Sequence, residues 1–368
     1  MKVMFANRQF DRIAGGVERM SIEMMNDLVA RGHEVELVSL DAPHASTFYP
    51  LDDRVGWHRV GIGDPTRKAT PREILARLHV IRQAIRRARP DVMIGFQQGA
   101  YILLALSSLG LGIPVIAAER NAPQRFDYLK DGHGRWFQFL SFGFAARITV
   151  QMESYRSHYP AVLRRRIVSI PNPVPQQVRG AEPGGHACTR KRLLCVARLS
   201  YQKNQSLLIE AFAKIANAFP DWDLTLVGGG EDEAKLQALA RSLQLSERVE
   251  FIGAVTNVEE WYLRSHIFCL SSRWEGFPNA LAEAMAFGLP AVGLIECAGV
   301  NELIQDGVTG QLAPSSADGL AVVLSALMAS PDVRRAMGNA ARAAMGPYAP
   351  QQVLDRWEAL FSDVARTR

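Results

Sequence analysis

The sequence has few cysteines, and their spacing matches no metal or disulfide pattern. Its 368 residues include four Cys, with no C-x-x-C pair and no His at metal-ligand spacing from any of them. The pattern therefore excludes a disulfide framework, and a reducing cytosol fits. Cys195 and Cys269 stand inside apolar, strand-like runs. We expect these two thiols to be structural.

Long hydrophobic runs are also absent. No segment approaches the ~20 apolar residues of a membrane span, and the first residues, MKVMFANRQF, are typical of a short strand rather than of a signal peptide. The 29 glycines form no repeat, and 48% of the residues are hydrophobic, which excludes fibrous and disordered classes. We expect a cytoplasmic protein, at most peripheral on the inner face of the cell membrane.

Charge is distributed unevenly along the chain. The formal net charge is +5, but residues 1–170 hold 24 Lys and Arg against 16 Asp and Glu, whereas residues 171–368 hold 18 against 21. Such asymmetry favours an anionic partner for the first part of the chain.

Short apolar runs alternate with helical periodicity through the whole chain. At about 150 residues per domain, the length predicts two domains. Pro and Gly without periodicity mark residues 171–191 as a linker. The alternation predicts an α/β fold of two Rossmann-like, doubly wound domains facing a central cleft, one at 1–172 and one at 190–349. A helix at 350–368 is expected to return to the first domain.

The most informative segment is WEGFPNALAEAMAFGLP at 274–290. Gly276 permits close approach of a ligand, Pro278 suits a helix start, and the Ala-rich run from Asn279 propagates the helix. The free amides of that helix start form an anion site. Glu283 follows one turn later, on the same face as Asn279, where its carboxylate would accept hydrogen bonds from sugar hydroxyls.

Three glycine-rich or basic loops accompany this segment. Arg198 and Lys203 follow the run RLLCVA and suit a diphosphate, although basic residues are common in such loops. The loop VGGGED at 227–232 matches neither a dinucleotide fingerprint nor a P-loop, so NAD and NTP chemistry are not supported. Gly15 and Gly16 open the first helix, either for a phosphate or acceptor or simply as a tight turn.

Together these motifs resemble the retaining glycosyltransferases of the GT-B fold, family 4. The resemblance rests on AGGVER at 14–19, PNPV at 171–174, ARLSYQKN at 197–204, VGGGED at 227–232, FIG at 251–253, SSRWEGFPNALAEAMAFGLPAVG at 271–293 and AGVNELIQDGVTGQL at 298–312. It implies that Arg198 and Lys203 hold the donor diphosphate, that Glu275 contacts the donor sugar, and that Glu283 binds the ribose. The other donor-binding residues that it implies are Gly15, Gly16, Gly229, Gly276, Phe277, Pro278, Asn279 and Ala280.

One segment departs from many relatives, which have a histidine after the strand that ends near residue 119. Here the sequence is Glu119-Arg120-Asn121, similar to bacterial enzymes that add N-acetylhexosamines to polyprenyl-diphosphate-linked oligosaccharides. Any of the three would face the reacting sugar, and for Arg120 a structural ion pair is an equal alternative. Asp221-Trp222-Asp223 matches the D-x-D metal motif but is interpreted as a turn before a strand. No metal and no cofactor are expected.

The resemblance implies front-face transfer from a UDP-sugar to a glycan acceptor on a lipid diphosphate. Alternatives are a nucleotide-sugar 2-epimerase or hydrolase of the same fold, a dehydrogenase, and a sugar-binding protein. Nucleic acid is not an expected partner, because no binding module is present. The basic residues of 67–89, the cluster Arg164–Arg166 and the aromatic segment 134–144, with Arg125, Lys130, Arg135 and Arg147 as neighbours, suit an anionic membrane. A solvated helix face and buried aromatics are the alternative.

Overall fold

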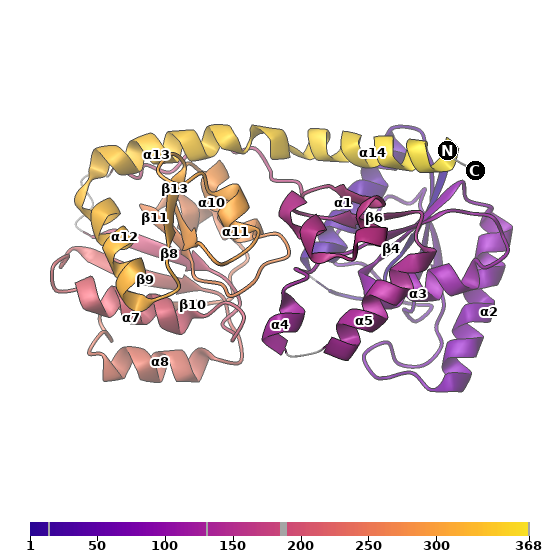
Figure 1. The fold of residues 1–368 in the computed structure, drawn as a ribbon, viewed down its shortest axis with the longest axis horizontal. Helices are drawn as coiled ribbons and strands as arrows, with labels where there is room; N and C mark the ends of the chain where they lie inside the picture. The colour runs from indigo at the N-terminus through magenta and orange to yellow at the C-terminus, as the bar shows by residue number, and fades with distance from the viewer. Residues whose placement is uncertain (14, 130–131, 185–189, 367–368) are drawn as a thin grey trace. The chain divides into compact units, whose positions relative to one another are not determined.

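The computed structural model describes residues 1–13, 15–129, 132–184 and 190–366. The chain forms two compact units: unit 1 is Met1–Pro173 with Gln351–Arg368, and unit 2 is Val174–Pro350. Each unit is a parallel sheet with helices packed on it (Figure 1). The predicted class of two Rossmann-like α/β domains is therefore confirmed. Ala14, Lys130 and Cys188 lie outside the described residues.

The sheet of unit 1 has the order β3-β2-β1-β4-β5-β6-β7 in the part of the chain that the structure describes. The strands are β1 (Lys2–Ala6), β2 (Glu34–Ser39), β3 (Gly56–Arg59), β4 (Val92–Phe96), β5 (Val115–Ala118), β6 (Arg147–Val150) and β7 (Ile167–Ser169). The order changes direction between β1 and β4. Open parallel sheets bind ligands at such a point, beyond the carboxyl ends of the strands.

The helical segments of unit 1 are α1 (Gly16–Ala30), α2 (Pro71–Ala88), α3 (Gln97–Ser107), α4 (Arg125–Leu129), α5 (Gly132–Ser141), η1 (Phe142–Phe144), η2 (Glu153–His158), α6 (Ala161–Arg164) and α14 (Pro350–Arg366).

Helices α1 and α14, which are far apart in the sequence, cover one face of this sheet. Leu28 of α1 and Trp357 of α14 pack with Phe5 of β1. Arg31 adds ion pairs to Asp355 and Glu358, each at 2.6 Å. Helix α14, yellow in Figure 1, is thus part of unit 1.

The basic residues of 67–89 do not form one solvated face. Helix α2 begins at Pro71, where Thr70 and Glu73 form a capping box. Arg77 is only 5% exposed and donates two hydrogen bonds to the carbonyl oxygen of Ile62. Arg82 donates to the carbonyl oxygens of Ser107 and Leu109. Arg77 therefore belongs neither to a membrane-facing surface nor to a solvated helix face, and Arg82 is half-buried and bonded to the protein.

The sheet of unit 2 has the order β10-β9-β8-β11-β12-β13 among the described residues. Its strands are β8 (Lys191–Val196), β9 (Trp222–Val227), β10 (Val249–Gly253), β11 (Ile267–Leu270), β12 (Ala291–Leu294) and β13 (Gly310–Ala313). Its helices are α7 (Gln205–Ile215), α8 (Glu233–Ser242), α9 (Glu259–Leu263), α10 (Asn279–Ala286), α11 (Val300–Leu303), α12 (Ala317–Ala329), α13 (Pro331–Ala344) and η3 (Gly346–Tyr348). The change of direction lies between β8 and β11, so the loops after these strands meet at one edge.

The hydrophobic core of unit 2 contains two of the free thiols. Phe212 of α7 and Leu324 of α12 pack with Cys195 of β8 and Cys269 of β11. Burial raises the pKa of Cys195 to about 12. Cys297 is also buried and free. These three thiols are therefore unreactive at neutral pH.

The segment that the sequence assigns to a linker is bonded to unit 2 over its described part. The amide of Val174 donates to the carbonyl oxygen of Tyr348 at 2.8 Å, and the amide of Ala181 donates to that of Phe287 at 2.7 Å. None of the helices in the described part of the chain combines the length and hydropathy needed to cross a membrane.

Candidate active site

A buried ion pair joins the two loops at the change of strand order in unit 2. The ammonium of Lys203, after β8, lies 2.6 Å from Oε1 of Glu275, after β11. The hydroxyl of Ser272 donates to the same oxygen at 2.6 Å. Glu275 is only 3% exposed. Its carboxylate is therefore fixed in one orientation and holds the lysine beside it.

Further hydrogen bonds make these two loops one surface. The amide of Arg273 donates to the carbonyl oxygen of Gln202, and the side chain of Gln202 donates to that of Trp274, both at 2.8 Å. The hydroxyl of Ser271 donates to the carbonyl oxygens of Lys203 and Asn204. These contacts position the ion pair and were not visible in the sequence motifs.

Arg198 differs from Lys203 in that its side chain has no partner among the described residues. Its side chain is exposed, and no described side chain or backbone group bonds to its guanidinium. Its carbonyl oxygen accepts a hydrogen bond from the side chain of Gln205 at 2.9 Å, which fixes the backbone of the loop. The guanidinium is thus available for a ligand.

The loop after β9 packs against the Arg198 loop through two glycines. A Cβ at Gly228 would lie 2.1 Å from the carbonyl oxygen of Ala197, and one at Gly230 would lie 2.1 Å from that of Leu199. Gly228 also has φ of +131°, a conformation that favours glycine. Nothing lies within 4 Å of a Cβ at Gly229. Gly229, the residue expected at the donor, is therefore the one that faces open space.

Helix α10 begins at Asn279 without a side-chain cap. Phe277 and Pro278, which precede it, are buried, and the ring of Phe277 lies 6.0 Å from that of Tyr348. Because these two side chains are packed inside unit 2, the turn exposes its backbone groups and not these side chains to a ligand. Gly276 and Ala280 are half-buried beside them. Uncapped amides in the first turn of a helix favour an anion.

Glu283 projects from α10 one turn beyond Asn279, and a tyrosine holds it. The hydroxyl of Tyr262 in α9 donates to Oε2 of Glu283 at 2.9 Å. Tyr262 is fully buried, and burial, reinforced by the Glu283 charge, raises its phenol pKa well above the usual value. The phenol therefore stays a donor. The sequence motifs gave no signal for Tyr262.

The glycine loop of unit 1 lies after β1 and is organised by two acids. Asp41, buried after β2, accepts hydrogen bonds from the amides of Phe10 and Asp11. Gly15 is the N-cap of α1, again without a side-chain cap. A Cβ there would lie 2.0 Å from Oε2 of Glu18, whose pKa is raised by burial. Gly15 thus makes room for this carboxylate, and Gly16 starts the helix in an exposed position.

The segment after β5 in unit 1 has three differently placed side chains. Glu119 is 3% exposed and accepts hydrogen bonds from the amides of Arg120 and Asn121, and from the side chain of Gln138. Its carboxylate therefore shapes the loop. Asn121 is exposed.

Arg120 is buried, with its guanidinium 5.1 Å from the ring of Trp357. Its Nη1 donates to Asn172 at 3.4 Å, whereas Nε and Nη2 have no partner among the described residues. Burial lowers its pKa to about 9, against the opposing effect of Glu119. Glu119 therefore has a structural role, whereas Nε and Nη2 of Arg120 could still donate hydrogen bonds to a ligand.

The D-x-D segment takes part in ion pairs. Asp221 pairs with Lys191 at 2.7 Å, and Asp223 pairs with Arg190 and Arg248. Since β9 begins at Trp222, Asp223 lies inside the strand and not in a turn, which corrects that part of the interpretation. Within the described residues, no group of three or more His, Cys, Asp or Glu is arranged to hold a metal ion.

Two family models cover most of the chain. "Glycosyltransferase Family 4" matches residues 14–178, and "Glycosyl transferases group 1" matches residues 181–344. The chain belongs to the family 4 glycosyltransferases. This glycosyltransferase is 26% identical over 354 residues to an uncharacterized glycosyltransferase of Haemophilus influenzae, covering 95% of this chain and 96% of that one. The recognition of the family from its motifs is confirmed.

Two further proteins resemble this glycosyltransferase along its length. One is the GalNAc-alpha-(1->4)-GalNAc-alpha-(1->3)-diNAcBac-PP-undecaprenol alpha-1,4-N-acetyl-D-galactosaminyltransferase of Campylobacter jejuni, 24% identical, with 95% of this chain and 96% of that one covered. The other is the structure of HepE of Anabaena in complex with UDP and glucose, with a TM-score of 0.77, 18% identity and coverage of 98% of this chain and 99% of that one. The latter shows the shared fold.

Proposed function

We propose that this glycosyltransferase moves a hexose or N-acetylhexosamine from a UDP-sugar to a glycan acceptor on a polyprenyl diphosphate. The transfer would retain the anomeric configuration, need no metal ion, and serve bacterial polysaccharide, lipopolysaccharide or glycan-precursor synthesis. The observation that carries the proposal is the arrangement in unit 2, where the Lys203–Glu275 pair, the unpartnered Arg198 and the uncapped start of α10 follow adjacent strands.

Each group at this edge has a distinct task in the proposed reaction. The bond between the anomeric carbon and the diphosphate oxygen breaks, and the acceptor oxygen bonds to that carbon on the same face. The acceptor proton passes to the leaving diphosphate. Arg198, Lys203 and the α10 amides would stabilise the charge that grows on the diphosphate, while Glu275 and Glu283 would hold sugar and ribose hydroxyls. Unit 1 would bind the acceptor, with Arg120 and Asn121 as candidate contacts.

The relatives support this donor and acceptor. The name of the Campylobacter jejuni relative specifies an undecaprenol-linked oligosaccharide acceptor, and HepE was solved with UDP and glucose. The 2-epimerase or hydrolase alternative is not favoured, because the Campylobacter jejuni and Haemophilus influenzae relatives are named as transferases. A cytoplasmic location, peripheral to the inner face of the membrane, follows for an enzyme that uses both a nucleotide sugar and a lipid-linked acceptor.

Ligand-induced stabilisation tests the donor. We expect UDP to raise the melting temperature more than GDP, ADP or NAD, because a ligand that binds only the folded state stabilises it. A panel of UDP-sugars, each with and without lipid extract and analysed by mass spectrometry, would then identify donor and acceptor. A product formed only with lipid extract supports the transferase. Release or epimerisation of the sugar without any acceptor would overturn it.

An apolar stripe on unit 1 suits the proposed membrane contact. Trp136, Phe137 and Leu140 of α5 and Phe144 of η1 are 57–74% exposed. Their spacing places 136, 140 and 144 along one side of the helical segment. Phe142 is 1% exposed and Phe139 is half-buried, so the alternative of buried aromatics holds for Phe142 but not for Trp136, Phe137 and Phe144. Exposed apolar side chains of this size mark an interaction surface.

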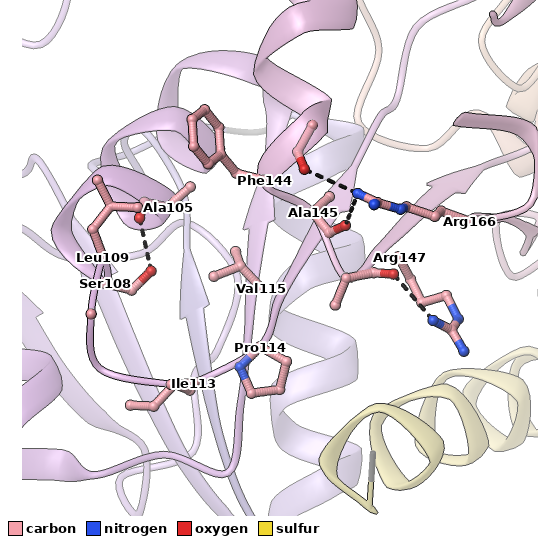
Figure 2. A pocket seen from close by; sticks show the side chains of 14 residues that line it. Ala105, Ser108, Leu109, Ile113, Pro114, Val115, Phe144, Ala145, Arg147 and Arg166 are labelled. Carbon is pink, nitrogen blue, oxygen red and sulfur yellow. Dashed lines mark hydrogen bonds between the residues drawn. The ribbon is translucent and has the colours of Figure 1, made fainter. Parts of the chain in front are cut away.

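Cations stand beside this stripe at the amino edge of the sheet. Phe144 lines a pocket of about 480 Å³ together with Leu109, Ile113, Arg147 and Arg166. Arg166 donates to the carbonyl oxygens of Gly143 and Ala145, and Figure 2 shows its bond to Ala145. None of the described residues that line the pocket is acidic, although Arg147 also pairs with Asp363 at 3.2 Å. Apolar side chains flanked by arginines match an anionic bilayer, where each cation contributes about 1 kcal/mol.

Liposome flotation tests this surface. We expect the protein to float with vesicles that contain phosphatidylglycerol, and the double substitution Trp136→Ser and Leu140→Ser to reduce the bound fraction at least severalfold. Both side chains are more than 70% exposed, so the fold should survive. The matched control is Val322→Ser on α12, which is 71% exposed in unit 2. Flotation that is absent at low salt, or equal in all variants, would contradict the assignment.

A further inference from the structure

A second cationic pocket lies at the amino edge of the sheet of unit 2. It has a volume of about 440 Å³, and its polar lining comes from Arg179, Glu182, Arg190, Arg192, Arg264, Ser265 and His266. Arg190 immediately precedes β8, Arg192 is its second residue, and His266 immediately precedes β11. The donor residues Arg198 and Glu275 follow the opposite ends of these strands. A strand of six residues spans about 20 Å, so the two sites are separate.

The arginines of this pocket keep donors that the protein does not use. Arg190 bonds to Asp223 through Nε and Nη2. Arg192 bonds through the same two nitrogens, to Thr225 and Glu250. Nη1 of each has no partner among the described residues. Arg179 has no partner in the described chain, and Arg264 has only Glu260, at 3.5 Å. The bonds through Nε and Nη2 thus fix the guanidinium groups of Arg190 and Arg192, while their Nη1 atoms and the guanidinium of Arg179 can donate to a ligand.

His266 provides an independent indication that the pocket binds an anion. It is 4% exposed, and its Nδ1 accepts a hydrogen bond from the amide of Arg192 at 3.1 Å. Burial, with Arg334, Lys191 and Arg192 nearby, lowers its pKa to about 4, so the ring is neutral at pH 7. The proton is therefore on Nε2, which has no partner among the described residues although the ring lines the pocket. A ring donor that has no acceptor in the described chain and belongs to the pocket lining is suited to a ligand acceptor.

We propose that this pocket binds a multiply charged phosphate anion, such as a pyrophosphate or a phosphate ester, at a site distinct from the donor site. Arg179, Arg264 and Nε2 of His266 would donate hydrogen bonds to its oxygens, whereas the hydroxyl of Ser265 already donates to the carbonyl oxygen of Trp261 at 2.6 Å. Glu182 is the acidic residue of the lining and opposes the anion. Because Arg179 belongs to the segment between the start of unit 2 and β8, bound anion would fix this segment against the sheet.

Calorimetric titration with inorganic pyrophosphate, at saturating UDP so that the donor site is filled, tests the proposal. We expect saturable binding that the double variant Arg179→Gln and Arg264→Gln weakens at least tenfold. Glu182→Gln should tighten it severalfold. Both arginines lie at the surface, so the fold should not change. Arg241→Gln, an exposed arginine of α8, is the matched control and should bind as the parent protein does.

Hydrogen exchange provides a second measurement that does not depend on activity. Pyrophosphate should protect amides in peptides that contain residues 176–184 and 262–267. Binding that UDP abolishes, or binding that is equal in the double variant and in the parent, would overturn the proposal, as would the absence of binding. Failure here would leave the glycosyltransfer proposal untouched, since the titration is independent of donor and acceptor turnover.

Discussion

Replacing Arg198 by alanine is expected to lower kcat about a hundredfold, the usual effect of removing one preorganised group beside developing charge. The guanidinium is exposed, and no described group bonds to it. It therefore contributes nothing measurable to the fold, and the melting temperature should stay within about 1 °C of the parent value. A loss of activity without a change in stability indicates a residue that acts on the ligand and not on the fold.

Two further variants make this test specific. Arg198→Lys keeps the charge but loses the two-pronged geometry, so its kcat should lie between the parent and alanine values. Arg241→Ala removes an arginine from the exposed face of α8 and should turn over normally. Parent-like kcat in Arg198→Ala would remove Arg198 from the site. A comparable loss in Arg241→Ala would mean that general charge, not position, matters.

The fold was predictable where apolar strands and amphipathic helices carry a periodic signal. Strands β1, β8 and β11 correspond to the strand-like runs at the start of the chain and around Cys195 and Cys269. Strand β3, GWHR, was not predicted, because all four of its residues are half-buried at the edge of the sheet and the run is short and polar. Helix α3 was missed for the opposite reason. It follows β4 directly, and its apolar sequence QQGAYILLALS lacks a polar face.

The site was predictable as a set of loops but not as a set of contacts. Spacing and resemblance pointed to Lys203 and Glu275, which are 72 residues apart, but nothing in either motif indicated that they form a pair. The same is true of Tyr262, which holds Glu283 from another helix. The burial of Arg77 could not be predicted from the sequence either, because Arg77 and the exposed arginines of α2 belong to one basic run. Such features depend on tertiary packing, which local sequence does not specify.

Substituting Lys203 by methionine is expected to reduce both kcat and stability. The carboxylate of Glu275 is 3% exposed and would lose the ammonium that compensates its charge. Breaking a buried pair from one side costs about 3 kcal/mol of unfolding free energy, at the low end of the usual range because part of the Lys203 side chain is exposed. If Lys203 also binds the donor diphosphate, kcat should fall about a hundredfold or more.

The double variant Lys203→Met and Glu275→Gln separates these two effects. Removing the carboxylate charge as well should restore most of the lost unfolding free energy, since the destabilisation comes from the uncompensated charge. Turnover should stay low, because neither the cation nor the carboxylate is present for the donor. Chemical denaturation and kcat would be measured on the parent, both single variants and the double variant. A double variant that regains both stability and turnover would show that the pair only joins the loops after β8 and β11 and does not act on the donor.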